Sequence, residues 1–273
     1  MEISQLIKVS YPFANVAELC INRPEKLNSI TYNMFREIGL SFEKFAVDPE
    51  VRVIVITGNE KFFSAGGDIF ELAGGFPYDS EDPARKALYL QKIFRTLSES
   101  FECIEKCGKP VIAAVSGICI GSGLEMVLSA DIRYCTKNMK FSLKEVNNGI
   151  TSWMGGVQKI QKLIGANSWI REILFTGRYV DSEESYKTGL FSRVFETYKE
   201  MMDYTMEMAQ LIASKSPVAL YGTKTNLNFS RDHPVKENFD FTANWNSWSY
   251  QTNDLTLSIS SQLQKTIPVF PRL

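Results

Sequence analysis

Two glutamates have the sequence surroundings that proton-transfer chemistry requires. Glu125 lies in the first turn of a helix that we expect to begin near Gly121, and its neighbours Leu124 and Met126 are apolar. Burial raises the pKa of a carboxyl group and makes it useful as a general acid or base. Glu145 follows a short predicted strand. If the two meet, they form an acid/base pair; alternatively, Glu125 complements the helix dipole and Glu145 is an ordinary loop charge.

Two glycine-containing loops each follow a predicted buried strand. The first is Ser64-Ala65-Gly66-Gly67-Asp68, and the second runs from Gly117 to Gly123. Glycine lets a ligand approach the main chain closely, and free N–H groups at a helix start suit a negative oxygen. Two such loops could aim two N–H donors at one point, which would be an oxyanion hole. The alternative is a pair of tight turns.

Other chemistries fit the sequence less well. After Gly121-Ser122-Gly123 the third glycine of a dinucleotide loop is replaced by Met126, and no Gly-Lys-Ser/Thr phosphate loop occurs. The single histidine, His233, has no Gly-x-Ser-x-Gly partner motif. Cys103 and Cys107 lie one helical turn apart without a second pair, so we expect reduced structural thiols, in a reducing compartment, rather than a metal site.

The elements that would position these residues change along the chain. Strand and helix patterns alternate up to about residue 150, with β-branched strands at 51–56 and 111–115 and helices at 32–45 and 83–106. Later segments are helical, including one long predicted helix over 235–263. We therefore predict an α/β core over 1–200 and a helical region over 201–273. Large apolar residues in the last helix indicate packing on the chain's own core or, as we favour, on a neighbouring subunit.

Composition narrows the classes of partner. The 273 residues are 44% hydrophobic and 22% charged, with a formal net charge of -1 and no basic stripe, so we do not expect nucleic-acid binding. No run of 18 apolar residues predicts a membrane span. The ending Pro271-Arg272-Leu273 is similar to the Ser-Lys-Leu class of peroxisomal address. The alternative is a tail without a targeting role.

The motifs together resemble those of the enoyl-CoA hydratase/isomerase (crotonase) superfamily. The segments that carry the resemblance are 22–30 (NRPEKLNSI), 63–68 (FSAGGD), 113–134 around GSGLE and ADIRY, and 175–194. They cover nearly the whole chain in order. The resemblance implies a crotonase-like α/β fold of stacked ββα units with a helical C-terminal trimerisation region, assembled as a homotrimer or hexamer.

The resemblance also implies a site for an acyl-CoA thioester, with no cofactor because coenzyme A is part of the substrate. The matched positions place the oxyanion-hole N–H groups on Ala65 and Ser122, where the family usually has glycine in place of Ser122. The further positions implied for binding substrate and CoA are Arg23, Lys26, Leu27, Ser64, Gly66, Gly67, Asp68, Gly121, Trp153 and Lys265. Lys265 would meet the 3′-phosphate, reaching a neighbouring subunit.

The resemblance is strongest to 3,5-dienoyl-CoA to 2,4-dienoyl-CoA isomerases, in segments such as 214–219 and 242–246. Those enzymes usually carry Asp where Glu125 stands, and another Asp where this chain has Trp153. Glu125 and Glu145 match the paired glutamates of enoyl-CoA hydratases. Our hypothesis is a dienoyl-CoA isomerase of fatty-acid β-oxidation in which Glu145 moves the proton and Glu125 assists. The alternatives are hydration of a 2-enoyl-CoA by the glutamate pair, and a non-catalytic acyl-CoA-binding protein.

Overall fold

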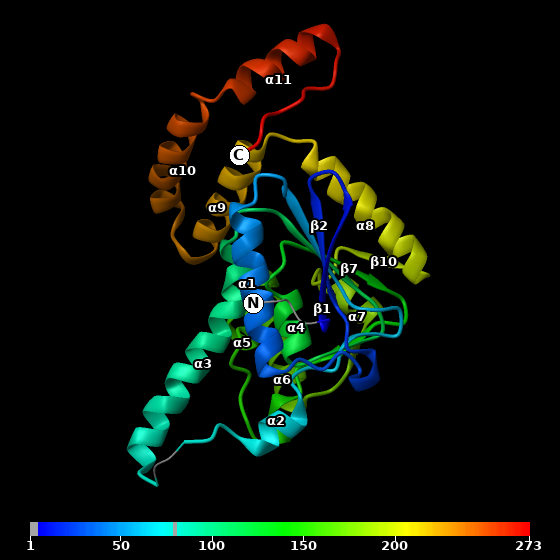
Figure 1. The fold of residues 1–273 in the computed structure, drawn as a ribbon, viewed down its shortest axis with the longest axis vertical. Helices are drawn as coiled ribbons and strands as arrows, with labels where there is room; N and C mark the ends of the chain where they lie inside the picture. The colour runs from blue at the N-terminus through cyan, green and yellow to red at the C-terminus, as the bar shows by residue number, and fades with distance from the viewer. Residues whose placement is uncertain (1–4, 79–80) are drawn as a thin grey trace.

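The computed structural model describes residues 5–78 and 81–273. Its larger sheet has the order β1-β2-β3-β5-β7-β10 and is parallel except for the β1–β2 hairpin (Figure 1). Its strands are β1 (Ile7–Phe13), β2 (Val16–Ile21), β3 (Val53–Thr57), β5 (Val111–Val115), β7 (Ile132–Thr136) and β10 (Arg193–Phe195). All residues of β3 and β5 are buried, because helices cover both faces of this sheet.

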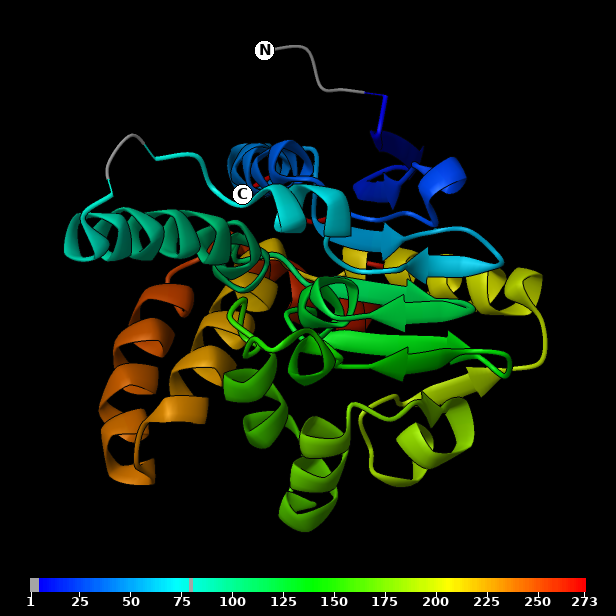
Figure 2. The ribbon, with the colours of Figure 1, turned by 90° about the horizontal axis from the view of Figure 1, so that it is seen from below.

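A smaller sheet lies across the ends of the first. It has the order β4-β6-β8-β9, and its strands are β4 (Phe62–Ser64), β6 (Ile118–Ile120), β8 (Lys140–Ser142) and β9 (Val180–Asp181). The consecutive pairs β3/β4, β5/β6 and β7/β8 each contribute one strand to each sheet, and helical structure follows each pair. Figure 2 shows these units one below the other, from cyan to green. The predicted α/β fold of stacked ββα units is confirmed.

Helices α1 (Tyr32–Val47) and α3 (Pro83–Lys106) pack together over one face of the large sheet. The side chain of Thr31 caps α1 by accepting from the Met34 N–H. Phe35 and Phe42 of α1 and Phe101 of α3 are buried in the main core. The burial of these rings supplies the apolar contact that holds the helix pair on the sheet.

The other face of the large sheet is covered by α8 (Tyr198–Ala213). A capping box formed by Thr197 and Glu200 starts this helix. Met201 and Ala209 are buried against Val53 and other strand residues in a second apolar cluster. Helix α8 thus crosses the boundary predicted at residue 200 and packs on the sheet, and the division of the chain into two regions stays a prediction.

Shorter helices fill the connections between strands and lie around the small sheet. They are η1 (Pro24–Lys26), α2 (Ile69–Gly74), α4 (Ser122–Val127), η2 (Glu145–Asn148), α5 (Gly156–Leu163), α6 (Asn167–Thr176) and α7 (Ser182–Lys187).

The C-terminal helices α9 (Pro217–Asp232), α10 (Val235–Ser249) and α11 (Asn253–Gln264) extend away from the sheets (Figure 1). The single helix predicted over 235–263 is wrong, because it is interrupted after residue 249. The Thr252 side chain accepts from the Asp254 N–H and starts a new helix there. Phe239 and Trp248 of α10 are largely exposed. Self-association through this region stays a prediction.

Two further expectations from the sequence concern membrane-spanning helices and the cysteines. No helix within residues 5–78 and 81–273 has the length and apolar character needed to cross a bilayer. All five cysteines are free thiols, and Cys107, Cys119 and Cys135 are buried.

Candidate active site

Three neighbouring strands of the small sheet, β4, β6 and β8, lead into one cavity of about 70 Å³. Residues 65–68 follow β4, Gly121 and α4 follow β6, and Glu145 begins η2 shortly after β8. Parallel strands end at the same edge of a sheet, which is where ligands bind in α/β folds. This topology brings Glu125, Glu145 and both glycine loops together around the cavity.

Glu125 is 1% exposed and its carboxylate is held in place. Its Oε1 accepts from the Ser152 hydroxyl, and from the backbone N–H groups of Met154 and Gly156, each at 3.1 Å. Burial raises the pKa of Glu125, while these three donors and the nearby Lys159 ammonium act to lower it. The carboxyl group of Glu125 therefore has a fixed position at the wall of the cavity.

Glu145 has fewer partners. Burial, with a smaller contribution from the nearby Glu125 charge, raises the pKa of Glu145 to about 7. Its Oε2 is buried and has no hydrogen-bond partner among the described residues. A carboxyl group of this pKa changes protonation state at neutral pH, which is what an efficient general base needs.

Gly121 allows Glu145 to come this close to the start of α4. A Cβ atom at position 121 would lie 2.8 Å from Glu145 Oε1, and the backbone of Gly121 has a positive φ of 51°. Both observations favour glycine over any residue with a side chain.

The backbone donors differ from the predicted pair at one position. The Ala65 N–H donates to the Leu27 carbonyl at 3.0 Å, so Ala65 is not available as an oxyanion donor. Gly67, two residues later, borders the cavity, and so does Ser122. No described residue accepts a hydrogen bond from the N–H of Gly67 or Ser122. Gly67 and Ser122 therefore each have an unused N–H donor at the cavity.

Other residues predicted to bind substrate instead support the first loop. Arg23 forms an ion pair with Asp68 at 2.6 Å and also donates to the Ser29 hydroxyl at 2.9 Å. The Arg23 guanidinium lowers the pKa of Asp68, and Asp68 in turn accepts from the Phe70 N–H at the start of α2. These contacts fix the loop, and the role of Arg23 in binding substrate stays a prediction.

Ser64 is fully buried and has a similar supporting role. Its hydroxyl donates to the Asn28 carbonyl at 2.8 Å and accepts from the Gly66 N–H at 3.1 Å. Gly66 borders the cavity with a φ of +93°. The Ser64 hydroxyl is therefore not free for substrate, while Gly66 lies against the space where substrate would bind.

The predicted cationic contacts lie outside the cavity. Lys26 is exposed, with its Nζ 5.6 Å from the centroid of the Phe70 ring, and Leu27 is 54% exposed beside it. Lys265 is exposed and directly follows α11, and this helix lies at the opposite end of the molecule from α2 in Figure 1. Within one chain Lys265 does not border the cavity, and its role toward a neighbouring subunit stays a prediction.

Trp153 borders the cavity, which the sequence left undecided. Its backbone carbonyl accepts from the Ser98 hydroxyl of α3 at 2.8 Å. Its indole packs on Phe94 of the same helix, with ring centroids 4.8 Å apart. The residues on either side of it, Ser152 and Met154, are those that hold Glu125.

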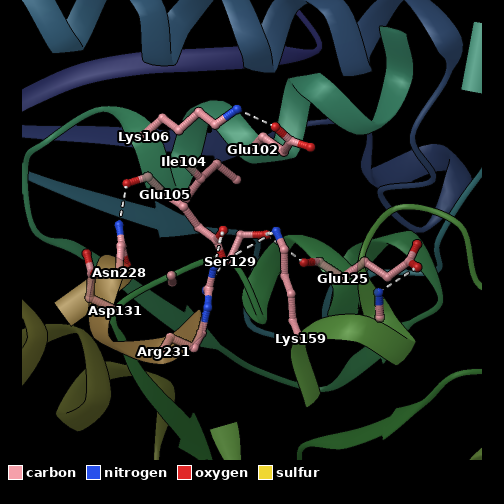
Figure 3. Close-up of polar contacts among 12 residues, drawn as sticks. Glu102, Ile104, Glu105, Lys106, Glu125, Ser129, Asp131, Lys159, Asn228 and Arg231 are labelled. Carbon is pink, nitrogen blue, oxygen red and sulfur yellow. Dashed lines mark hydrogen bonds and ion pairs between the residues drawn. The ribbon is translucent and has the colours of Figure 1, made fainter. Parts of the chain in front are cut away.

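Behind Glu125, polar contacts connect four helices, as Figure 3 shows. The Ser129 hydroxyl donates to the Glu125 carbonyl at 3.0 Å and accepts from Lys159 Nζ of α5 at 2.6 Å. Lys159 also pairs with Glu105 of α3 at 3.5 Å, and Glu105 pairs with Arg231 of α9 at 3.0 Å. Burial lowers the pKa of Lys159. The network fixes the end of α4 relative to the surrounding helices.

Several cavity residues escaped sequence reasoning. Tyr32, Phe35, Lys144 and Ile150 all border the cavity. The hydroxyl of Tyr32 is buried without a partner among the described residues. Their positions depend on how α1 and η2 pack, and no local motif marks them. No group of three or more His, Cys, Asp or Glu side chains in the described chain is arranged to hold a metal ion.

A family model described as enoyl-CoA hydratase/isomerase matches residues 13–271 of this chain. The chain belongs to the enoyl-CoA hydratase/isomerase family. Among similar family members, the human mitochondrial Delta(3,5)-Delta(2,4)-dienoyl-CoA isomerase is 40% identical over 93% of this chain and 78% of its own. The peroxisomal enzyme of that name from Arabidopsis thaliana is 34% identical over 95% of this chain and 94% of its own.

Solved structures of the family agree with the fold. The crystal structure of an enoyl-CoA hydratase from Bacillus anthracis superposes with a TM-score of 0.87 at 27% identity, covering 98% of this chain and 99% of the other. The predicted membership of the crotonase superfamily, and the resemblance to dienoyl-CoA isomerases, are confirmed.

Proposed function

We propose that this enzyme converts 3,5-dienoyl-CoA thioesters to 2,4-dienoyl-CoA thioesters. The observation that carries the proposal is Glu145, whose pKa is raised to about 7 and whose Oε2 is unpartnered at a cavity with two unused N–H donors. The names of its relatives support the choice of substrate.

In the proposed reaction the thioester oxygen accepts from the N–H groups of Gly67 and Ser122. Glu145, as a carboxylate, removes a proton from C2, and the negative charge spreads over the thioester oxygen, C2, C4 and C6 as a conjugated trienolate. The same carboxyl group then returns the proton at C6, so the substrate neither gains nor loses atoms. The two donors stabilise the trienolate more than the neutral thioester, which lowers the barrier.

Glu125 assists by position and charge. Its Oε1 is held by three donors, so it is a poor candidate for carrying a proton over a distance. Its charge raises the pKa of Glu145, which strengthens Glu145 as a base. The indole of Trp153 has no titratable proton for this purpose, so Glu145 serves both proton-transfer steps.

Hydration of a 2-enoyl-CoA is the second candidate. The observation in its favour is that Glu125 and Glu145 both border the cavity. In this reaction the pair would hold and deprotonate a water molecule that adds to C3. A non-catalytic acyl-CoA-binding protein would need the same cavity, but it would not need a carboxyl group whose pKa lies near 7.

Ultraviolet absorbance separates these candidates. Isomerisation of a 3,5-dienoyl-CoA creates a conjugated dienoyl thioester with a new band at longer wavelength, whereas hydration of a 2-enoyl-CoA removes the enoyl band. We expect the new band with the wild-type enzyme and its loss with Glu145→Gln. Loss of the enoyl band alone would establish the hydratase instead. Binding without either change would establish a non-catalytic protein.

We propose that the exposed Lys26 and the half-buried Lys144 meet CoA phosphates, as flexible point charges do. Lys144 borders the cavity, and its Nζ lies 3.8 Å from the Tyr179 ring centroid. Replacing both lysines by Met should raise KM and weaken its salt dependence. An unchanged KM at low salt would rule the pair out.

We also propose assembly into homotrimers or hexamers through α9–α11, supported by the exposed apolar side chains of α10 and α11. Molar mass by light scattering tests this, and a monomer at micromolar concentration would refute it.

For location we propose the peroxisome, supported by the C-terminal tripeptide and by the peroxisomal Arabidopsis relative, although the mammalian relatives are mitochondrial. Import that survives deletion of Leu273 would contradict this.

A further inference from the structure

The side chain of Trp153 borders two hollows. One is the cavity of about 70 Å³ that contains the two glutamates. The other is a groove of about 900 Å³ along α3, bordered also by Leu90, Phe94 and Ser98. Trp153 therefore forms part of the wall between the small cavity and a hollow more than ten times larger.

This wall is aromatic and continuous. The ring centroids of Trp153 and Phe94 are 4.8 Å apart, those of Phe94 and Phe76 are 5.7 Å apart, and those of Phe76 and Tyr32 are 4.5 Å apart. Tyr32 also borders the cavity. The rings thus run from one side of the cavity, across the N-terminal half of α3, to the other side.

The backbone at Trp153 is fixed on both sides of the ring. Its carbonyl is bound to Ser98, and the flanking residues Ser152 and Met154 are bound to the Glu125 carboxylate. The indole cannot leave the wall by a simple shift of the loop without breaking the contacts that hold Glu125. The remaining freedom is rotation of the side chain itself.

We infer that Trp153 and Phe94 form a gate that limits the length of the acyl chain. This rests on the proposed function, which places the thioester between Gly67 and Ser122. The first carbons of the acyl chain occupy the small cavity, and a longer hydrocarbon tail meets the indole of Trp153, which the Phe94 ring supports from the side of the groove. Removing the indole joins the cavity to the groove along α3, where the apolar side chains of Ala87 and Leu90 can receive the tail. Removing the Phe94 ring leaves space in the groove into which the indole can rotate, which opens the same passage.

Binding of saturated acyl-CoAs tests the gate without relying on turnover. Each buried CH₂ contributes about 0.8 kcal/mol, or roughly fourfold in affinity. In the wild type we expect Kd, measured by calorimetry from butanoyl-CoA to decanoyl-CoA, to stop falling when the tail reaches the gate. In Trp153→Ala and Phe94→Ala it should continue to fall, by roughly fourfold per CH₂, so that the variants bind decanoyl-CoA at least tenfold more tightly than the wild type does.

Two gate variants are used so that the test does not depend on the folding of either one alone. Trp153→Ala alters the segment that holds Glu125, whereas Phe94→Ala leaves that segment intact and removes the ring on α3 that supports the indole, and Phe94 is 37% exposed. Phe175→Ala is a matched control, because Phe175 is 71% exposed on α6 and borders neither hollow. Its chain-length dependence should equal that of the wild type.

The outcomes are distinct. The gate would be refuted if affinity rose with chain length equally in the wild type and both gate variants. It would also be refuted if affinity did not depend on chain length in any of these proteins. Binding that follows the expected pattern without any isomerisation of dienoyl-CoA would support the gate and refute the isomerase. If no acyl-CoA binds, the proposed function and the gate both fail.

Discussion

Replacing Glu145 by Gln should abolish turnover and stabilise the fold at alkaline pH. As the proposed base, Glu145 contributes about 10²–10⁴-fold to the rate. The pKa of Glu145 is about 7 in the folded chain, against 4.5 for an ordinary glutamate. In the wild type, the rate should therefore rise about tenfold per pH unit below pH 7 and level off above it, because only the carboxylate removes the proton.

The stability of the wild-type fold changes with pH in the opposite direction to its rate. Because the folded state holds the Glu145 proton more tightly than the unfolded state, stability is lost as pH rises from about 4.5 through 7. The loss is below about 1 kcal/mol at pH 5 and reaches at most about 3 kcal/mol at pH 8, since one pKa unit corresponds to about 1.4 kcal/mol. Glutamine has no proton to lose, so the variant avoids this loss.

Urea unfolding at pH 5 and pH 8, beside the ultraviolet assay, measures both effects. The gain in unfolding free energy of Glu145→Gln over the wild type should be larger at pH 8 than at pH 5. Glu207→Gln is a suitable control, because Glu207 is exposed on α8, and it should leave the pH dependence unchanged. An identical pH dependence of stability in Glu145→Gln and wild type, or normal turnover by the variant, would refute the assignment.

Three further predictions concern the neighbouring residues. Ser122→Pro should lower kcat by about 10²–10³-fold, because proline at the first position of a helix is tolerated but lacks the N–H donor. Ser122→Ala keeps this N–H and should retain activity. Equal rates for the two variants would exclude the Ser122 N–H as a donor to the thioester oxygen. Gly121→Ala should lower both kcat and Tm, because its Cβ would contact Glu145 Oε1; wild-type values of both would contradict the close approach. Lys224→Met should cost about 3–5 kcal/mol of unfolding free energy by denaturant titration, because Lys224 is 3% exposed and pairs with Asp131 at 2.8 Å; a loss below 1 kcal/mol would show that this pair contributes little.

The sequence predicted the long elements of the fold and missed the short ones. The β-branched runs of β3 and β5 and the periodic helices α1 and α3 were evident. The three-residue strands β4 and β6 and the two-residue β9 are too short for any periodicity to show. These strands build the small sheet, so the meeting of Glu125 and Glu145 could not be derived from spacing alone.

The assignment of Ala65 failed for a related reason. The positive φ of Gly66, +93°, turns the backbone between Ala65 and Gly67, so their N–H groups need not point the same way. Ile30 pairs with this loop through the Gly66 carbonyl and the Asp68 N–H, and Leu27 takes the Ala65 N–H, which leaves the Gly67 N–H directed elsewhere. The motif located the loop, but only the pairing of the loop with residues 27–30 determines which of its N–H groups is free.

The late position of α8 in the chain has a consequence for synthesis. Strands β2, β3, β5 and β7 are complete by residue 136, but the face formed by Val53, Val55 and Ile112 is covered only when α8, residues 198–213, has emerged. Until then a nascent chain presents a row of apolar side chains to its surroundings. Such exposed surface makes incomplete chains prone to aggregation. A chain truncated before residue 198 should therefore need a chaperone to stay in solution, whereas the complete chain covers this face with its own helix.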